Sequence, residues 1–339
     1  MTMKSQSSNR ANFKDGLSKI WPSLRIILSL LLLIKAFSHI EWSKLSEQLP
    51  NIQPTWLIFA GFLLIAGNVL AGVRWGLLMR TAGFMINLRR SIELYFAGSL
   101  INQGLPTTLG GDSFRAVIAT KSHGDLDTLQ NVDFAHAPPR TRKSFYIVGL
   151  DRTLGLAGNS LLGAIGLCLG GQAINAWANS VGLILLLIMI IGALGISLFL
   201  LFDPTQSFFN KLMSKLGMPD SLKPTLKAWG LPNILFQLPL AIIIHLFTLA
   251  AFWACLKACG LNAPIESLMI GMPALGLLLM LPISISGWGL RETTLAGVLG
   301  LWGLDPALIV LSSILYGLAT LVITLIGLPS LLKTRHHRS

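Results

Sequence analysis

Long runs of apolar residues, separated by short polar loops, form the dominant pattern of this 339-residue chain. A membrane helix needs roughly 20 consecutive apolar residues to cross the hydrocarbon core of a bilayer. Runs of about this length predict six full transmembrane helices, at about 21–37, 55–79, 144–169, 181–202, 234–256 and 306–332. The pattern therefore predicts an all-α polytopic membrane protein.

Two further apolar segments are interrupted by residues that an ordinary membrane helix does not tolerate. The first break contains Asn102, Pro106, Gly110, Gly111, Asp112 and Arg115. The second break follows Pro282 and contains Ser284, Ser286, Gly287, Arg291 and Glu292. Irregular backbone is stable at membrane depth only where protein buries it or water lines it. Interruptions at corresponding positions of two halves point to the substrate site of a transporter, so we expect both breaks to bind substrate.

The distribution of Lys and Arg orients these segments, because cytoplasmic loops carry an excess of basic residues. Residues 1–20 and 334–339 are basic and are predicted to be cytoplasmic tails. To satisfy the charge rule, residues 91–119 must form a hairpin that enters from the cytoplasm and turns at 105–106. Residues 266–302 must form a second hairpin that enters from the outer side.

Six full helices and two re-entrant hairpins then give eight hydrophobic segments in a single membrane domain, residues 21–333. Its two halves, about 21–170 and 181–333, contain the same order of segments with opposite orientation, which is an inverted repeat. We expect a multi-pass protein of the inner (plasma) membrane with both termini in the cytoplasm.

The composition supports a membrane protein and argues against nucleic-acid binding. Hydrophobic residues make up 53% of the chain and charged residues 12%, far below the quarter that is typical of soluble domains. Mean hydropathy is +0.68. The net charge is +12, but the basic residues lie in short loops and tails between apolar runs. The three cysteines and six histidines show no zinc spacing, so we expect no metal and no cofactor.

The charged residues at the breaks and inside the spans are the candidate chemistry. A broken helix directs free N–H groups and a positive dipole end inward, which suits an anion such as a lipid phosphate. Arg74 either contacts lipid phosphate or extends to the interface. Asp151 and Arg152 lie inside a predicted span, where charges are costly. We expect Asp112 to pair with Arg291 and Arg115 with Glu292, or the first hairpin to pair with Asp151 and Arg152. A buried ion network that only fixes the fold is the alternative.

Taken together, these motifs resemble a known family. Arg74-Trp75, the motif from Asn102 to Arg115, the pair Asp151-Arg152 and the motif from Pro282 to Glu292 are similar to the transmembrane, flippase-type domain of lysylphosphatidylglycerol synthases, which also occurs as a stand-alone protein. The resemblance covers residues 20 to 333. It implies a lipid-translocating domain whose first motif and Arg-Glu motif line the lipid pathway. No aminoacyl-transferase domain follows residue 333, so lysine transfer is not expected.

Three functions fit the sequence. The first is a flippase or scramblase that moves a lipid with an anionic or polar headgroup between leaflets, the lipid being a phospholipid, a polyprenyl lipid or a hopanoid. The second is an intramembrane enzyme acting on a lipid headgroup or polyprenyl phosphate, with Asp112, Asp151 or Glu292 as general base, although the sequence has no metal-ligand cluster and no Ser/His/Asp set. The third is an accessory subunit that holds a lipid-biosynthesis enzyme in the membrane. The sequence predicts no oligomeric state.

Overall fold

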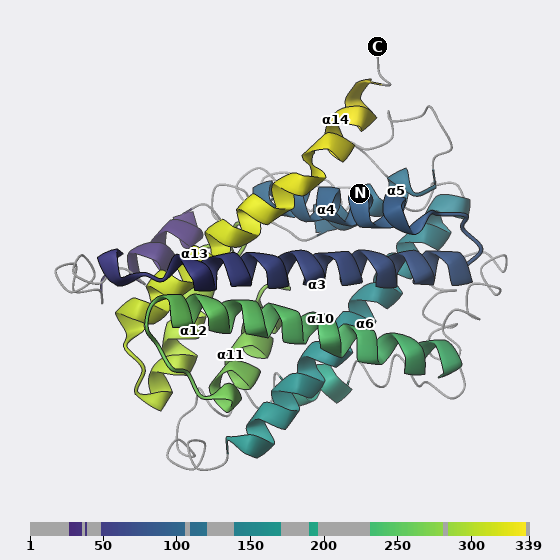
Figure 1. The fold of residues 1–339 in the computed structure, drawn as a ribbon. Helices are drawn as coiled ribbons and strands as arrows, with labels where there is room; N and C mark the ends of the chain where they lie inside the picture. Colours follow the sequence, from purple (N-terminus) through teal and green to yellow (C-terminus); the bar gives the residue numbers. More distant parts are fainter. Residues whose placement is uncertain are drawn as a thin grey trace, which may run out of the picture.

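The computed structural model describes residues 27–35, 38, 49–105, 109–120, 139–170, 190–195, 231–280 and 284–336. All regular structure in these ranges is helical, which confirms the predicted all-α class. Four long helices dominate Figure 1: α3 (Pro54–Thr81), α6 (Pro139–Leu169), α10 (Leu231–Ala258) and α13 (Pro306–Thr324). α13 continues through the 3-10 turn η5 (Leu325–Gly327) into α14 (Leu328–His336).

Four of the six predicted spans correspond to helices long and apolar enough to cross a bilayer. These are Pro54–Thr81, Arg140–Leu169, Asn233–Ala258 and Pro306–Lys333. Of the predicted span 21–37 the structure describes the helical stretch 27–35 and the single residue 38 just beyond it. Of the predicted span 181–202 it describes only the helical residues 190–195, and the rest lies outside the described residues.

Both predicted breaks divide a segment into two shorter helices. The first pair is α4 (Leu88–Gly104) and α5 (Leu109–Ile118), and the second is α11 (Ile265–Leu278) and α12 (Leu290–Leu299). α5 and α12 have 10 residues each. They are therefore about 15 Å long, half the thickness of a hydrocarbon core. Pro106 and Pro282 fall outside the described residues. Short 3-10 turns, η1 (Leu49–Asn51) and η4 (Gly300–Trp302), precede α3 and follow α12.

The corresponding long helices of the two halves, α3 and α10, pack side by side and run antiparallel (Figure 1). The backbone N–H of Gln53, just before α3, donates to the carbonyl of Ala258 at the end of α10 at 3.0 Å. Further along, Gly67 of α3 faces Phe247 of α10. An inverted repeat requires this antiparallel relation between corresponding helices. The full repeat and the re-entry of the hairpins stay predictions.

Small residues bring the helices together, as is typical of membrane bundles. α5 lies against α4 where Gly111 meets the carbonyl of Gly98, and η5 reaches α4 where Gly327 contacts Phe96. α6 crosses α10 at Gly158 and α11 at Gly166. Because the backbones approach so closely, the hairpin helices are held in fixed positions.

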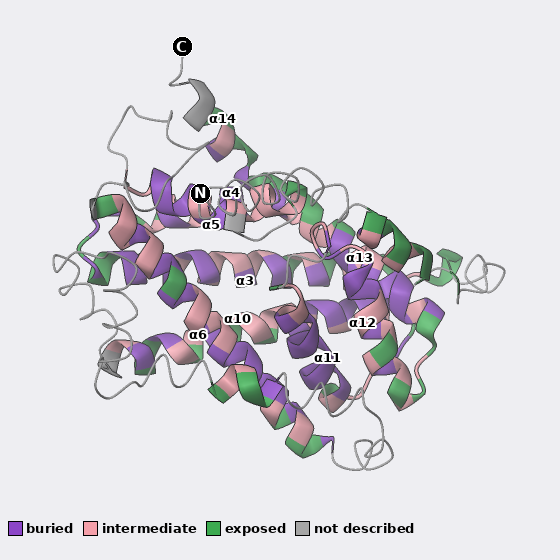
Figure 2. Ribbon diagram, turned by 180° about the vertical axis from the view of Figure 1, so that it is seen from behind, coloured by how far each residue is buried: buried purple, intermediate pink, exposed green. Residues whose placement is uncertain are grey.

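Buried and exposed apolar residues divide the helices into inner and outer faces. In Figure 2 α11 is buried over most of its length, and its buried residues include Pro273 and Leu275. Apolar side chains on the long helices point outward instead: Ile58 is 75% exposed, Phe62 65% and Val322 61%. An apolar outer surface of this kind is what a lipid environment accepts.

Cysteine labelling tests the re-entrant hairpins. With the three native cysteines replaced, single cysteines at Arg89 and Thr120 should both react with a membrane-impermeant thiol reagent from the cytoplasmic side. Single cysteines at Ile265 and Leu301 should both react from the outer side. Either pair reacting from opposite sides would show that its segment crosses the bilayer, and the inverted repeat would then be wrong.

Replacing Gly111 by Ala tests the close contact between α4 and α5. The added Cβ would overlap the Gly98 carbonyl oxygen, so a backbone must shift. We expect the free energy of unfolding to fall by about 1–3 kcal/mol, the usual cost of overpacking. Gly149→Ala is the control, because a Cβ there meets nothing within 4 Å. Equal denaturation midpoints for the two variants in detergent would contradict the contact.

Candidate functional site

Five charged side chains from three helices form one network, which we call the first ion cluster: Arg74 of α3, Asp112 and Arg115 of α5, and Asp151 and Arg152 of α6. Nη2 of Arg74 donates to Oδ1 of Asp151 at 2.8 Å, and its Nε donates to the same oxygen at 3.1 Å. Nη2 of Arg115 donates to Oδ1 of Asp112 at 2.6 Å and lies 3.6 Å from Oδ2 of Asp151. Nε of Arg152 donates to Oδ2 of Asp112 at 2.6 Å.

The first ion cluster is almost completely removed from solvent. Arg74, Asp112, Arg115 and Asp151 are each at most 4% exposed, whereas the side chain of Arg152 is 41% exposed. The guanidinium carbon of Arg115 lies 5.1 Å from the ring centre of Trp75 and 4.5 Å from that of Tyr95. These aromatic faces stabilise a desolvated cation. The cluster connects α5 to both α3 and α6.

The second break carries a separate ion pair. Nη2 and Nε of Arg291 donate to Oε1 of Glu292 at 2.8 and 3.0 Å, and Ser313 of α13 bonds both residues at 3.0 Å. The other carboxylate oxygen of Glu292 accepts the backbone N–H of Gly289 at 2.7 Å and so caps α12. Glu292 is fully buried, and Trp288 lies beneath the Arg291 guanidinium at 4.8 Å.

The expected pairing of Asp112 with Arg291 and of Arg115 with Glu292 is therefore wrong. The other expectation holds, because Asp112 and Arg115 pair with Arg152 and Asp151 of α6. Adjacent residues on a helix do not face each other. Glu292 turns back to cap its own helix, and the long Arg291 side chain reaches the carboxylate there. Helical spacing alone therefore did not predict the ion pair between these two neighbouring residues.

Neutral hydrogen bonds, not salt bridges, connect the two breaks. The hydroxyl of Ser286 donates to Oε1 of Gln103 at 2.8 Å and lies 3.4 Å from the carbonyl of Asn102. Oδ1 of Asn102 accepts the backbone N–H of Gly111 at 2.8 Å, which holds α5 against the end of α4. Ser286 has a positive φ of 52°, an uncommon conformation for a residue with a side chain. We call these contacts the hairpin junction.

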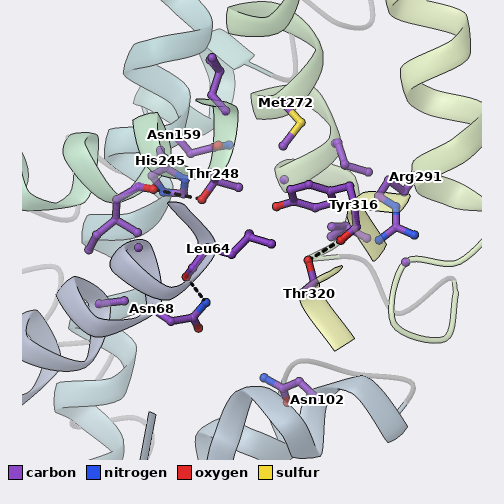
Figure 3. Close-up of a pocket in the computed structure, with 18 of the residues that line it drawn as sticks. Leu64, Asn68, Asn102, Asn159, His245, Thr248, Met272, Arg291, Tyr316 and Thr320 are labelled. Carbon is purple, nitrogen blue, oxygen red and sulfur yellow. Dashed lines mark hydrogen bonds between the residues drawn. The ribbon is translucent and has the colours of Figure 1, made fainter. Parts of the chain in front are cut away.

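A cavity of about 400 Å³ lies beside the hairpin junction. Figure 3 shows Asn159, His245 and Thr248 grouped on one side, Arg291 and Tyr316 on the other, and Asn102 apart from both groups. Most of the wall is apolar, with leucines from α3, α6, α10 and α11. Leu105, at the first break, belongs to the wall and is 40% exposed, so the cavity approaches the surface there.

The predicted site residues divide between these places. Asn102, Ser284, Ser286, Gly287 and Arg291 line the cavity. Glu292 lies behind Arg291. The five residues of the first ion cluster do not line this cavity, and neither do Gly110 and Gly111, which pack α5 against α4. Pro106 lies outside the described residues. The expected single polar centre is thus two centres, and Tyr95 is in contact with both.

Several polar wall residues were not predicted as site residues. They are Asn68, Gln103, Asn159, His245, Thr248, Tyr316 and Thr320. Nδ2 of Asn159 donates to the carbonyl of Pro273 at 3.0 Å, and Nε2 of His245 bonds the carbonyl of Gly155 at 2.9 Å. The signal was present in the sequence, because Asn68, Asn159 and His245 interrupt otherwise apolar spans.

No three His, Cys, Asp or Glu residues come together as metal ligands within the part of the chain that the structure describes. The polar part of the wall consists instead of amides, hydroxyls, the imidazole of His245 and one arginine. Such groups bind through hydrogen bonds.

The helices, the two breaks and the cavity beside them define a polytopic membrane protein with a candidate site between broken helices. The chain belongs to the family described as the lysylphosphatidylglycerol synthase TM region, whose model matches residues 23–327. Membership ties this membrane protein to lipid modification or transport. No curated protein and no solved structure matches the chain.

Replacing Asp151 by Asn tests how strongly the first ion cluster holds the fold. The change leaves Arg74 without a carboxylate in a site that is almost inaccessible to water. Breaking one side of a buried pair typically costs about 3–5 kcal/mol of folding free energy. Glu93→Gln is the control, because its partners Arg89 and Arg90 are 87% and 37% exposed and such pairs contribute less than about 1 kcal/mol. Similar denaturation midpoints for the two variants would contradict this role.

Proposed function

We propose that this protein moves a lipid between the two leaflets of the membrane, as a flippase or scramblase. The cavity between the broken helices is the observation that carries the proposal. At about 400 Å³ it lies in the size range of small-molecule sites, roughly 300–1,000 Å³. It has room for a headgroup and not for two acyl chains, so the chains stay in the surrounding lipid.

The wall matches an anionic or polar headgroup. Arg291 offers a guanidinium, which suits phosphate, and the amides of Asn68, Asn102 and Asn159 suit hydroxyl groups. Glu292 pairs with Arg291 and balances its charge before a lipid enters. The wall therefore holds no unpaired charge at Arg291 while the cavity is empty.

The position of the cavity fits translocation. Its wall combines residues of α3 and α4 from the first half with residues of α10, α11 and α13 from the second. Substrates of inverted-repeat transporters bind at the interface of the two repeats. The apolar outer faces of α3 and α13 let acyl chains lie against the protein while the headgroup is inside.

We also propose that the protein lies in the inner membrane with both termini in the cytoplasm, which the basic loops support. The family supports a lipid substrate, and an enzyme of lipid biosynthesis is the partner that would supply it. We propose that the chain itself catalyses no chemical change.

Liposomes that contain the purified protein test the proposal. A fluorescent phosphatidylglycerol should exchange between leaflets faster than in empty liposomes, as measured by quenching of the outer leaflet with dithionite. Thr248→Phe and Thr320→Phe should each fill the cavity and slow the exchange at least about tenfold, which corresponds to about 1.4 kcal/mol in the barrier. Both hydroxyls bond carbonyls of their own helices, and Thr320 also bonds the Tyr316 side chain on the same helix, so the changes break no hydrogen bond between helices.

Thr153→Phe is the matched control. Its hydroxyl makes the same bond to a carbonyl four residues back, but it lies on an exposed face of α6 outside the cavity. Normal exchange in all three variants would exclude the cavity as the pathway. A new lipid product in mass spectra of the liposomes would instead show an enzyme. Neither exchange nor a product would favour an accessory subunit.

A further inference from the structure

The first ion cluster contains more positive than negative charge. Three guanidinium groups, those of Arg74, Arg115 and Arg152, face the two carboxylates of Asp112 and Asp151. One positive charge is therefore in excess among the paired groups of the cluster. Uncompensated charge is costly in a site that is removed from water.

The same cluster contains buried N–H donors that have no acceptor. Nη1 of Arg74, Nη1 of Arg115 and Nε1 of Trp75 are inaccessible and make no hydrogen bond. Arg74 and Arg115 are 4% and 3% exposed, and Trp75 is fully buried. Trp75 follows Arg74 on α3 and lies under the Arg115 guanidinium. All the unpartnered groups here are donors, and none is an acceptor. Each buried polar group of this kind normally has a partner.

From the excess charge and the unpartnered donors together, we infer that the first ion cluster is an anion-binding site, separate from the cavity. Its ligand is a compact anion with one negative charge, either a small inorganic ion or the phosphodiester of a lipid. Such an ion would neutralise the excess positive charge of the cluster and accept hydrogen bonds from the free N–H groups. Arg152 is the half-exposed member and marks the side from which the anion enters.

This inference does not depend on lipid movement through the cavity, because the five charged residues do not line the cavity wall. The bound anion would stabilise the packing of the first hairpin. Two ion pairs join α5 to α6, Trp75 of α3 lies under Arg115 of α5, and Arg74 joins α3 to α6, so a bound anion would fix the first hairpin against these two long helices.

The test measures the thermal unfolding midpoint of the purified full-length protein in detergent. Sodium gluconate is exchanged for sodium chloride or sodium phosphate at constant ionic strength. In a separate arm, dioleoylphosphatidylglycerol is compared with dioleoylphosphatidylcholine. We expect the midpoint to rise with one of these anions and to saturate. Saturation by an inorganic ion identifies a free anion as the ligand, and saturation by phosphatidylglycerol alone identifies a lipid phosphate.

Arg152→Gln removes the excess charge and leaves both unpartnered guanidinium nitrogens in place. The concentration for half-saturation should rise at least about tenfold, as expected for losing one charge at short range. Trp75→Phe keeps the ring under Arg115 and removes one donor, so a smaller weakening is expected. Arg89→Gln removes the same charge from an exposed position and should bind normally. No saturable stabilisation, or equal behaviour of Arg152→Gln and Arg89→Gln, would overturn the assignment.

Discussion

A membrane interior offers no water to a free N–H group, a free carbonyl or a charge, and the whole arrangement of this protein depends on that constraint. Each break between short helices exposes backbone and brings in charged side chains, so each must be enclosed by other helices. The enclosing helices meet at small residues, as α5 does at Gly98 and α6 at Gly166, because only close backbone contact leaves the breaks well covered. The cavity lies where the covering helices from the two halves do not meet completely.

The two breaks satisfy this constraint in different ways. At the first break the charges of α5 pair with Asp151 and Arg152 of α6, and Arg74 of α3 also bonds Asp151, so α5 depends on both helices. At the second break Arg291 and Glu292 neutralise each other on one helix, and Ser313 supports them from α13. The uncharged hairpin junction is the contact between the two breaks. The cross-helix ion cluster and the cavity are thus spatially separate, although the sequence motifs alone give no sign of this.

Much of the architecture could be predicted from the sequence, because the physical signals are local. The apolar run beginning at Thr55 and the interruptions near Leu105 and Ser284 each specify a helix or a break without reference to the rest of the chain. Partner choice could not be predicted in this way. Whether Asp112 meets Arg152 or Arg291 depends on how α5 packs against α6, and no periodicity encodes a crossing position. The polar wall residues were missed for a related reason: a single Asn159 in an apolar helix shows that some partner exists, but not that it faces a cavity.

The charges of the second break pair on one helix, whereas those of the first break pair across helices, and this difference affects how each break can move. A break whose charges are balanced on its own helix can change its surroundings without separating an ion pair, whereas the first break cannot move relative to α3 and α6 without doing so. The cavity has Arg291 of the self-contained pair in its wall and excludes the cross-helix cluster. In the proposed lipid transport, a headgroup in the cavity would therefore meet an arginine whose partner lies on the same helix. The first half would serve as the fixed frame, and the second half would present the charged group to the lipid.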